Sequence, residues 1–238
     1  MIMEVAIMKR FFSLITLLLF ILSVVSCNSK SRENVPGDVD VISKATENRF
    51  SELEIRDYKG IKLDPSVGPR DNSIKGIQNV DINNYILKIS GLVKSPVSLT
   101  YDNVLALTAY EKVITLHCVE GWDATVLWKG ALLKDIIDIA GADEKADTVI
   151  FHCVDGYSTS ILLQDIIDKN MILAYSSNGI KLPPAMGYPF IVVAEDKLGY
   201  KWARWVSEIE LSDNPEYKGY WESRGYDNEA NVPAAEKK

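Results

Sequence analysis

Apolar and polar residues follow each other along this chain in patterns that predict several short strands. In residues 82–93 (INNYILKISGLV) the two kinds alternate, as is typical of a half-buried strand. The run VITLHC at residues 113–118 is apolar and β-branched and predicts a second strand. Residues 190–194 predict a buried strand, and the alternation in residues 204–211 predicts a further one.

A strand–turn–helix pattern occurs twice. HCVEGW at residues 117–122 recurs as HCVDGY at residues 152–157, and the two copies are followed by LLKDIID at 132–138 and LLQDIID at 162–168. In both later segments the apolar pairs share one helical face while the aspartates point to water. We expect two equivalent units flanking one pocket, and a chance resemblance between two similar patterns is the alternative.

Polar residues and glycines mark the ends of the predicted helices. Thr100 can cap a short helix in the segment TYDNVLAL, and Gly141 can end the helix that follows the first copy of the repeat. Thr159 or Ser160 is placed to cap the helix that follows the second copy.

The N-terminal residues predict export. Lys9 and Arg10 precede the apolar run 11–25, and Ser26 and Cys27 follow it. This order resembles a bacterial lipoprotein signal, with residues 24–26 as the lipobox and Cys27 as the lipidated residue. The alternative, a transmembrane anchor, needs about 20 apolar residues, more than the run holds.

This signal predicts the organisation of the whole chain. Residues 1–27 are the expected signal peptide and residues 28–49 a flexible linker. The mature protein is expected on the periplasmic side of a membrane, to which Cys27 attaches it. Of the 238 residues, 47% are hydrophobic, enough for a substantial core in the remaining domain.

Charge narrows the possible partners. The formal net charge is −7 and the lysines are scattered, whereas phosphate neutralisation needs a basic face. We therefore expect no nucleic acid partner.

The strongest chemical candidate is Cys118. The predicted strand delivers its thiol into a turn made by Glu120 and Gly121, with Trp122 directly after it. A strand fixes the position of such a thiol, and the loop leaves one side open to a ligand. The pattern therefore favours a reactive or metal-binding thiol.

Alternatives for this thiol involve its neighbours. Cys118 and Cys153 can form a disulfide in an oxidising compartment, or one is a cofactor ligand and the other a small buried hydrophobic residue. His117 and His152 each stand beside a cysteine and suggest zinc or copper. Adjacent strand residues point to opposite faces, however, which argues against a shared ion. No Gly-x-Ser-x-Gly motif supports a serine hydrolase.

Six segments together resemble one known family. In order they are HCVEGW, LWKGALLKDII, FHCVDGYSTSILLQD, LAYSSNGIKLPP, GYKWARWVSEIEL and YWESRGY. They resemble the molybdopterin-binding domain of the sulfite oxidase family, including its branch of bacterial methionine sulfoxide reductase catalytic subunits, over residues 58–230. The resemblance implies a single mixed, β-rich α+β domain in residues 50–230, followed by a disordered tail at 231–238.

The resemblance also implies roles for individual residues. Cys118 matches the ligand of molybdenum, and a soft thiolate suits a metal that changes oxidation state. Tyr226 matches the active-site tyrosine, and Arg224 beside it is expected to help hold an anion. Arg70 and Asn72 fall where the family has an Arg-Asn pair that reaches the metal site.

Other matches concern the pterin part of the cofactor. The segment after Cys153 is either a plain structural turn or a pterin contact formed by Asp155, Gly156, Tyr157 and Ser158. The family's phosphate anchors are a histidine, an arginine and a lysine, whereas this chain has Met186, Ile191 and Arg204 at the matching positions. A nearby lysine, Lys201, Lys129 or Lys75, is expected to supply the missing charge.

The function implied is that of a molybdopterin-dependent oxidoreductase. It would transfer an oxygen atom to or from a small sulfur-containing or similar oxyanion or sulfoxide substrate. No haem domain follows, so we expect a separate electron-transfer partner. The alternative is a lipoprotein that kept the fold, lost the cofactor and acts as a binding or scaffold module. Met186, Ile191 and a signal without twin arginines favour that alternative.

Overall fold

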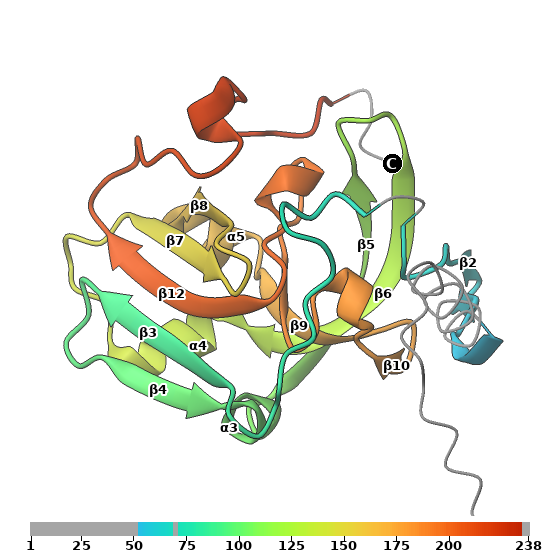
Figure 1. Ribbon diagram of the computed structural model, residues 1–238, viewed down its shortest axis with the longest axis horizontal. Helices are drawn as coiled ribbons and strands as arrows, with labels where there is room; N and C mark the ends of the chain where they lie inside the picture. Colours follow the sequence, from blue (N-terminus) through green and yellow to red (C-terminus); the bar gives the residue numbers. More distant parts are fainter. Residues whose placement is uncertain (1–51, 69–70, 235–238) are drawn as a thin grey trace, which may run out of the picture. The chain divides into compact units, whose positions relative to one another are not determined.

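Two five-stranded sheets form the framework of the computed structural model, which describes residues 52–68 and 71–234 (Figure 1). The first sheet has the order β10-β9-β6-β5, with β11 also paired to β9. Its strands are β5 (Ala109–His117), β6 (Asp123–Leu132), β9 (Ile172–Ser177), β10 (Ile180–Lys181) and β11 (Ile191–Val193). All described residues belong to one compact unit.

The second sheet has the order β4-β3-β12-β7-β8. Its strands are β3 (Ile86–Gly91), β4 (Val97–Thr100), β7 (Thr148–Cys153), β8 (Ser158–Leu162) and β12 (Val206–Ser212). β12 is parallel to β3 and antiparallel to β7. Two short strands, β1 (Asp57–Tyr58) and β2 (Ile61–Lys62), form a separate hairpin. The expected mixed, β-rich α+β fold is therefore confirmed.

The predicted strand at 82–93 is shorter in the structure, where it is β3. Asp81 explains the late start, because its Oδ1 accepts a hydrogen bond from the Asn83 backbone N–H at 3.1 Å and holds a turn. Burial then alternates along β3, with Leu87 and Ile89 facing the core.

The repeated segments adopt the same turn. The Cys118 N–H donates to the Trp122 carbonyl at 2.9 Å, and the Gly121 N–H donates to the Cys118 carbonyl at 3.0 Å. The equivalent bonds in the second copy measure 3.0 and 2.9 Å and join Cys153, Tyr157 and Gly156. The turn glycines have φ of 82° and 85°, which favours glycine. The repeat therefore corresponds to two hairpins of one design, β5–β6 and β7–β8.

Helix ends agree with the sequence at two of three places. Thr100 caps α3 (Tyr101–Leu105) and forms a capping box with Asn103. Gly141 ends α4 (Leu133–Ala140) with a positive φ of 68°. The start of α3 and the end of α4 therefore lie where the local side chains predict.

The predicted cap of the next helix is wrong. Helix α5 (Leu163–Asp168) begins after Leu162, and no side chain caps it. Thr159 and Ser160 lie within β8, where their backbones pair with β7. Sheet pairing therefore takes precedence over the local preference for a cap.

One apolar core connects both sheets and α4. It includes Trp128 of β6, Phe151 of β7, Leu173 of β9, Ile209 of β12 and Ile136 of α4. Each of these side chains is fully buried. Within the described part of the chain, no helix has the length and apolar character needed to cross a membrane.

The C-terminal segment, residues 213–234, follows β12 and passes over β8 (Figure 1). At Gly219 the two backbones touch, since a Cβ there would lie 2.1 Å from the Ser158 carbonyl oxygen. The ordered segment extends past residue 230, where the tail was expected to begin. Val232 is 3% exposed, and Asn231 accepts a hydrogen bond from Lys197 at 2.9 Å.

Several predictions concern residues that the structure does not describe. The expected signal peptide, Cys27 and the linker 28–49 lie outside the described residues, and so does Arg70.

Candidate functional site

A cavity of about 550 Å³ opens at the end of β5. One wall is formed by residues 67–68, 71–74 and 77, and another by the turn that contains Cys118. The 3-10 helices η1 (Pro184–Met186) and η2 (Gly199–Lys201) contribute further residues, as does the C-terminal segment next to η3 (Glu222–Arg224). Loops that are distant in the sequence therefore meet around one thiol.

Cys118 is half-buried and lines this cavity. Asn72 donates from Nδ2 to the Cys118 Sγ at 3.6 Å and to the Glu120 Oε2 at 3.4 Å. Trp122 donates from Nε1 to the same carboxylate oxygen at 3.2 Å. Glu120 therefore orients the Asn72 amide so that its N–H group faces the sulfur.

Burial raises the pKa of the Cys118 thiol, and the negative charge of Glu120 also raises it. The positive charge of Arg204 and the hydrogen bond from Asn72 act in the opposite direction. The pKa of the Cys118 thiol therefore lies above its ordinary value, so the thiol is protonated at neutral pH.

These opposing effects predict how Cys118 reacts with iodoacetamide in cofactor-free protein. Only the thiolate reacts, so the midpoint of the pH–rate profile should lie above that of free cysteine. Glu120→Gln removes a negative charge that disfavours the thiolate, so the midpoint should fall and alkylation at a fixed neutral pH should become faster.

Asn72→Ala is the matched comparison for this measurement. It removes a donor that stabilises the thiolate, so the midpoint should rise. Mass spectrometry of the labelled Cys118 peptide gives both rates. Midpoints that are identical in the three proteins would contradict this electrostatic account.

Arg204 lies between the two repeated turns. Its Nη1 donates to the Ala185 carbonyl at 2.9 Å and lies 3.9 Å from the Asp71 carboxylate. Burial lowers the pKa of this guanidinium, and its charge in turn lowers the pKa of both Cys118 and Cys153. An arginine remains cationic in such a place. It supplies the positive charge of the cavity near the thiol.

The two cysteines are both free. Cys153 is 6% exposed at the end of β7, and burial raises the pKa of its thiol well above the ordinary value. Cys153 is therefore a buried small apolar residue, and the disulfide alternative is not the arrangement found.

Each histidine has a carboxylate partner. The His117 Nδ1 lies 2.9 Å from Asp123 Oδ1, and the His152 Nε2 lies 2.7 Å from Glu210 Oε2. Nowhere in residues 52–68 and 71–234 do three or more His, Cys, Asp or Glu side chains gather as a metal-binding cluster. Both histidines link strand ends to neighbouring strands.

The second turn also reaches the cavity. Asp155 is 2% exposed and lines the cavity together with Tyr157, whose N–H donates to the Asp155 Oδ1 at 2.9 Å. The Ser158 hydroxyl instead bonds to the Tyr217 hydroxyl at 2.9 Å, away from the lining. The Lys75 Nζ lies 3.2 Å from the position of a Cβ on Gly156, so this lysine approaches the turn.

Tyr226 lines the cavity and Arg224 does not. The Tyr226 ring lies 5.3 Å from the Tyr200 ring and 5.1 Å from the Trp221 ring, measured between centroids. Arg224 stacks on Tyr220 with its guanidinium 3.6 Å from the ring centroid. Arg224 therefore lies outside the lining of the cavity, and its expected contact with an anion stays a prediction.

The lysines that were expected to supply the positive charge for the pterin phosphate differ in their position relative to the cavity. Lys201 is 1% exposed and bonded to Glu222, and Lys129 pairs with Glu111 at 3.8 Å. Neither lines the cavity. Of the residues matched to the family's anchors, Met186 and Arg204 line the cavity, and Ile191 lies in β11 in the core.

The structure thus brings together Asn72, Cys118, Asp155, Tyr157, Arg204 and Tyr226 around one cavity. It also adds residues that the sequence reasoning missed, namely Asp71, Glu120, Tyr200 and Trp221. Glu120 could have been found, since it stands two residues after Cys118 in the repeated motif. The others depend on how distant loops pack.

A family profile described as the oxidoreductase molybdopterin-binding domain matches residues 74–221. This range includes Cys118 and Arg204, whereas Asn72 and Tyr226 lie just outside it. The uncharacterized oxidoreductase YuiH of Bacillus subtilis is 34% identical over 147 residues, which cover 61% of this chain and 74% of YuiH.

A second relative is the protein-methionine-sulfoxide reductase catalytic subunit MsrP of Campylobacter jejuni. It is 26% identical, and the match covers 61% of this chain but only 54% of that protein. The crystal structure of the sulfane dehydrogenase SoxCD from Paracoccus pantotrophus is similar in fold, with a TM-score of 0.56 at 17% identity, over 70% of this chain and 52% of that one. This chain therefore belongs to the family of molybdopterin-binding oxidoreductase domains, as the resemblance to sulfite oxidases implied.

Proposed function

We propose that this oxidoreductase uses a molybdenum–molybdopterin cofactor whose metal is held by Cys118. The reaction is the transfer of an oxygen atom to or from a small sulfur-containing or similar oxyanion or sulfoxide substrate. The observation that carries the proposal is the Cys118 thiol in the wall of a cavity of about 550 Å³, with the Asn72 amide donating to its sulfur.

The side chains around the cavity fit such a cofactor. Cys118 offers one soft sulfur ligand, the type that suits a redox-active metal. Arg204 and Asn72 offer N–H donors, and Lys75 adds a charge near the second turn. Arg204 is suited to the phosphate or another anionic group, because a guanidinium can donate two parallel hydrogen bonds to it. The donor set therefore matches a metal with an anionic organic part.

Residues of this chain would prepare the reaction. The bound cofactor supplies a centre that accepts or donates two electrons as an oxygen atom is transferred. Asn72 holds the Cys118 side chain through its hydrogen bond to Sγ. Tyr226 also lines the cavity, where its phenol can donate a proton or a hydrogen bond to a substrate oxygen. The rings of Tyr200 and Trp221 pack beside Tyr226 and orient it.

The substrate class, the partner and the location belong to this proposal. One relative is a catalytic subunit named for methionine sulfoxide, which supports a sulfoxide substrate and a separate electron-transfer partner. The signal-like N-terminal sequence supports export and a membrane anchor at lipidated Cys27.

Metal and pterin analysis tests the proposal. The chain is produced in one host that makes molybdopterin and in another that lacks a gene for its synthesis. We expect about one molybdenum per chain by mass spectrometry, together with pterin fluorescence after acid release, only from the first host. Protein from the first host with neither molybdenum nor pterin would overturn the proposal and favour a cofactor-free binding module.

A further inference from the structure

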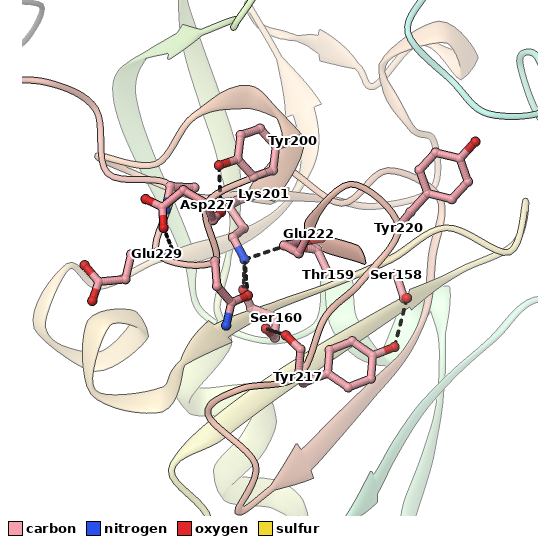
Figure 2. Close-up of polar contacts among 12 residues, drawn as sticks. Ser158, Thr159, Ser160, Tyr200, Lys201, Tyr217, Tyr220, Glu222, Asp227 and Glu229 are labelled. Atoms are coloured by element: carbon pink, nitrogen blue, oxygen red, sulfur yellow. Dashed lines mark hydrogen bonds and ion pairs between the residues drawn. The ribbon is translucent and has the colours of Figure 1, made fainter. Parts of the chain in front are cut away.

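Lys201 and Glu222 form an ion pair that is shielded from solvent. Their side chains are 1% and 0% exposed, and the Lys201 Nζ lies 2.7 Å from the Glu222 Oε1 (Figure 2). Removing two charges from water costs free energy that their attraction only partly returns. A buried pair of this kind therefore contributes little to the stability of the fold. What it can do is hold together the two segments of the chain that it joins.

The ammonium group of Lys201 has no donor left for another ligand. It carries three N–H groups. Besides Glu222, it donates to the Ser160 carbonyl at 2.9 Å (Figure 2). It also donates to the Asn228 Oδ1 at 3.4 Å. In this arrangement Lys201 does not serve as the phosphate ligand that the resemblance suggested.

The pair joins two segments that line the cavity. Lys201 ends η2 directly after Tyr200, and Glu222 begins η3 directly after Trp221. Tyr200, Trp221 and Tyr226 all contribute to the cavity lining. We call Trp221 and Tyr226 the aromatic wall.

Other contacts couple the aromatic wall to the pair. The Tyr200 hydroxyl donates to the Asp227 carbonyl at 2.8 Å, and the Tyr200 and Tyr226 rings meet edge to face (Figure 2 shows the first contact). Thr159 of β8 donates its hydroxyl to Glu222. The structure describes all of residues 213–234, and the only helix in this segment is the three-residue η3. Backbone hydrogen bonds join this segment to the rest of the domain at Tyr220, Ala230 and Val232. The backbone bonds within residues 221–229 are local, so side-chain contacts hold this part against the domain.

We propose that Lys201 and Glu222 are positioning residues, which hold the aromatic wall beside the Cys118 cavity, and that neither binds the cofactor. In a low-dielectric interior a charged hydrogen bond is short and directional, so it fixes the distance between η2 and η3. The inference rests on the proposed function only where Tyr226 is taken to face the substrate.

Hydrogen–deuterium exchange of the full chain, purified without cofactor, tests the position of the wall. In Lys201→Met we expect amides in residues 219–228 to exchange at least about tenfold faster than in wild type, because this segment opens locally. Peptides from β5, β6 and β9 should keep their rates. Unchanged exchange at 219–228, or an equal increase in all strands, would overturn the proposal, since the second result means a general loss of stability.

Two further variants sharpen the exchange experiment. Lys197→Met is the matched control: Lys197 is 7% exposed and pairs with Asp165 at 2.6 Å. Its ammonium group contacts the C-terminal segment at Asn231, outside the aromatic wall, so its loss should leave exchange at 219–228 unchanged. Glu222→Gln keeps an acceptor oxygen. If Lys201→Met does not fold, this variant tests whether the pair holds the aromatic wall. It should increase exchange at 219–228 by a smaller factor, and no increase would count against the proposal.

Molybdenum content separates positioning from cofactor binding. In a cofactor-producing host, Lys201→Met should retain the molybdenum of the wild type while its kcat/KM for dimethyl sulfoxide reduction falls. Loss of molybdenum with unchanged exchange at 219–228 would instead make Lys201 a cofactor ligand. If wild type itself holds no molybdenum, the proposed function fails, and the exchange experiment still decides the role of the pair.

Discussion

Cys118→Ala is expected to lower the molybdenum content of the protein to that of a preparation from a host without molybdopterin. Cys118 supplies the one thiol in the lining of the cavity. The described residues hold no cluster of three His, Cys, Asp or Glu side chains that could replace it. Oxygen-atom transfer should fall with the metal, by more than the roughly 10- to 100-fold that follows loss of a residue that only orients a ligand.

Cys153→Ala is the control for this loss. Cys153 occupies the equivalent place in the second hairpin, but its thiol is buried and does not line the cavity. This variant should keep the molybdenum of the wild type. The measurement is metal per folded chain by mass spectrometry, with circular dichroism to confirm folding. Equal molybdenum in wild type and Cys118→Ala would rule out thiolate ligation by this residue.

The largest expected loss of stability comes from Trp128→Ala. Trp128 is fully buried in β6, packs on Trp202 with ring centroids 5.5 Å apart, and donates from Nε1 to the Ile114 carbonyl at 3.2 Å. Its removal leaves a cavity and takes away the hydrogen bond that Nε1 donates to the Ile114 carbonyl. We expect the free energy of unfolding to fall by about 3–5 kcal/mol, measured by urea denaturation of cofactor-free protein.

Tyr110→Ala on the neighbouring strand β5 is the matched control. Tyr110 is also a large aromatic residue of this hairpin but is 38% exposed. Its replacement should lower the free energy of unfolding by less than about 1 kcal/mol. A similar loss in both variants would mean that the hairpin, and not the buried contact of Trp128 with Trp202, sets the stability.

Local patterns were sufficient for much of the framework. Alternation predicted β3 and β12, although β3 lies well inside its predicted segment and β12 begins two residues later and ends one residue later than predicted. The repeated motif predicted the same turn twice, because a glycine with positive φ and the bonds across the turn depend on only five neighbouring residues. The strand that follows each turn, β6 or β8, was not predicted, since the pattern was interpreted as strand, turn and helix. For the same reason Thr100 and Gly141 marked helix ends correctly.

Local patterns failed where a distant partner competes. Thr159 is a good helix cap in isolation, but β7 pairs with its backbone and Glu222 accepts its hydroxyl. Lys201 was expected at a phosphate, yet Glu222, 21 residues later, holds it in the interior. The stacking of Arg224 on Tyr220 also could not be predicted from local patterns.

The sequence by itself determined the fold class, the place of the Cys118 thiol at the end of a strand, and the family. The place of the thiol depends on contiguous residues, whose spacing sets strand, turn and exposure, whereas the fold class and the family followed from the resemblance of six segments to a known family. Only the tertiary structure decided which side chains meet that thiol. Asn72, Arg204 and Tyr226 come from three distant loops, and packing of the two sheets brings them to one cavity. It also placed Lys201 opposite Glu222, because a charge buried by packing must find its partner in the interior.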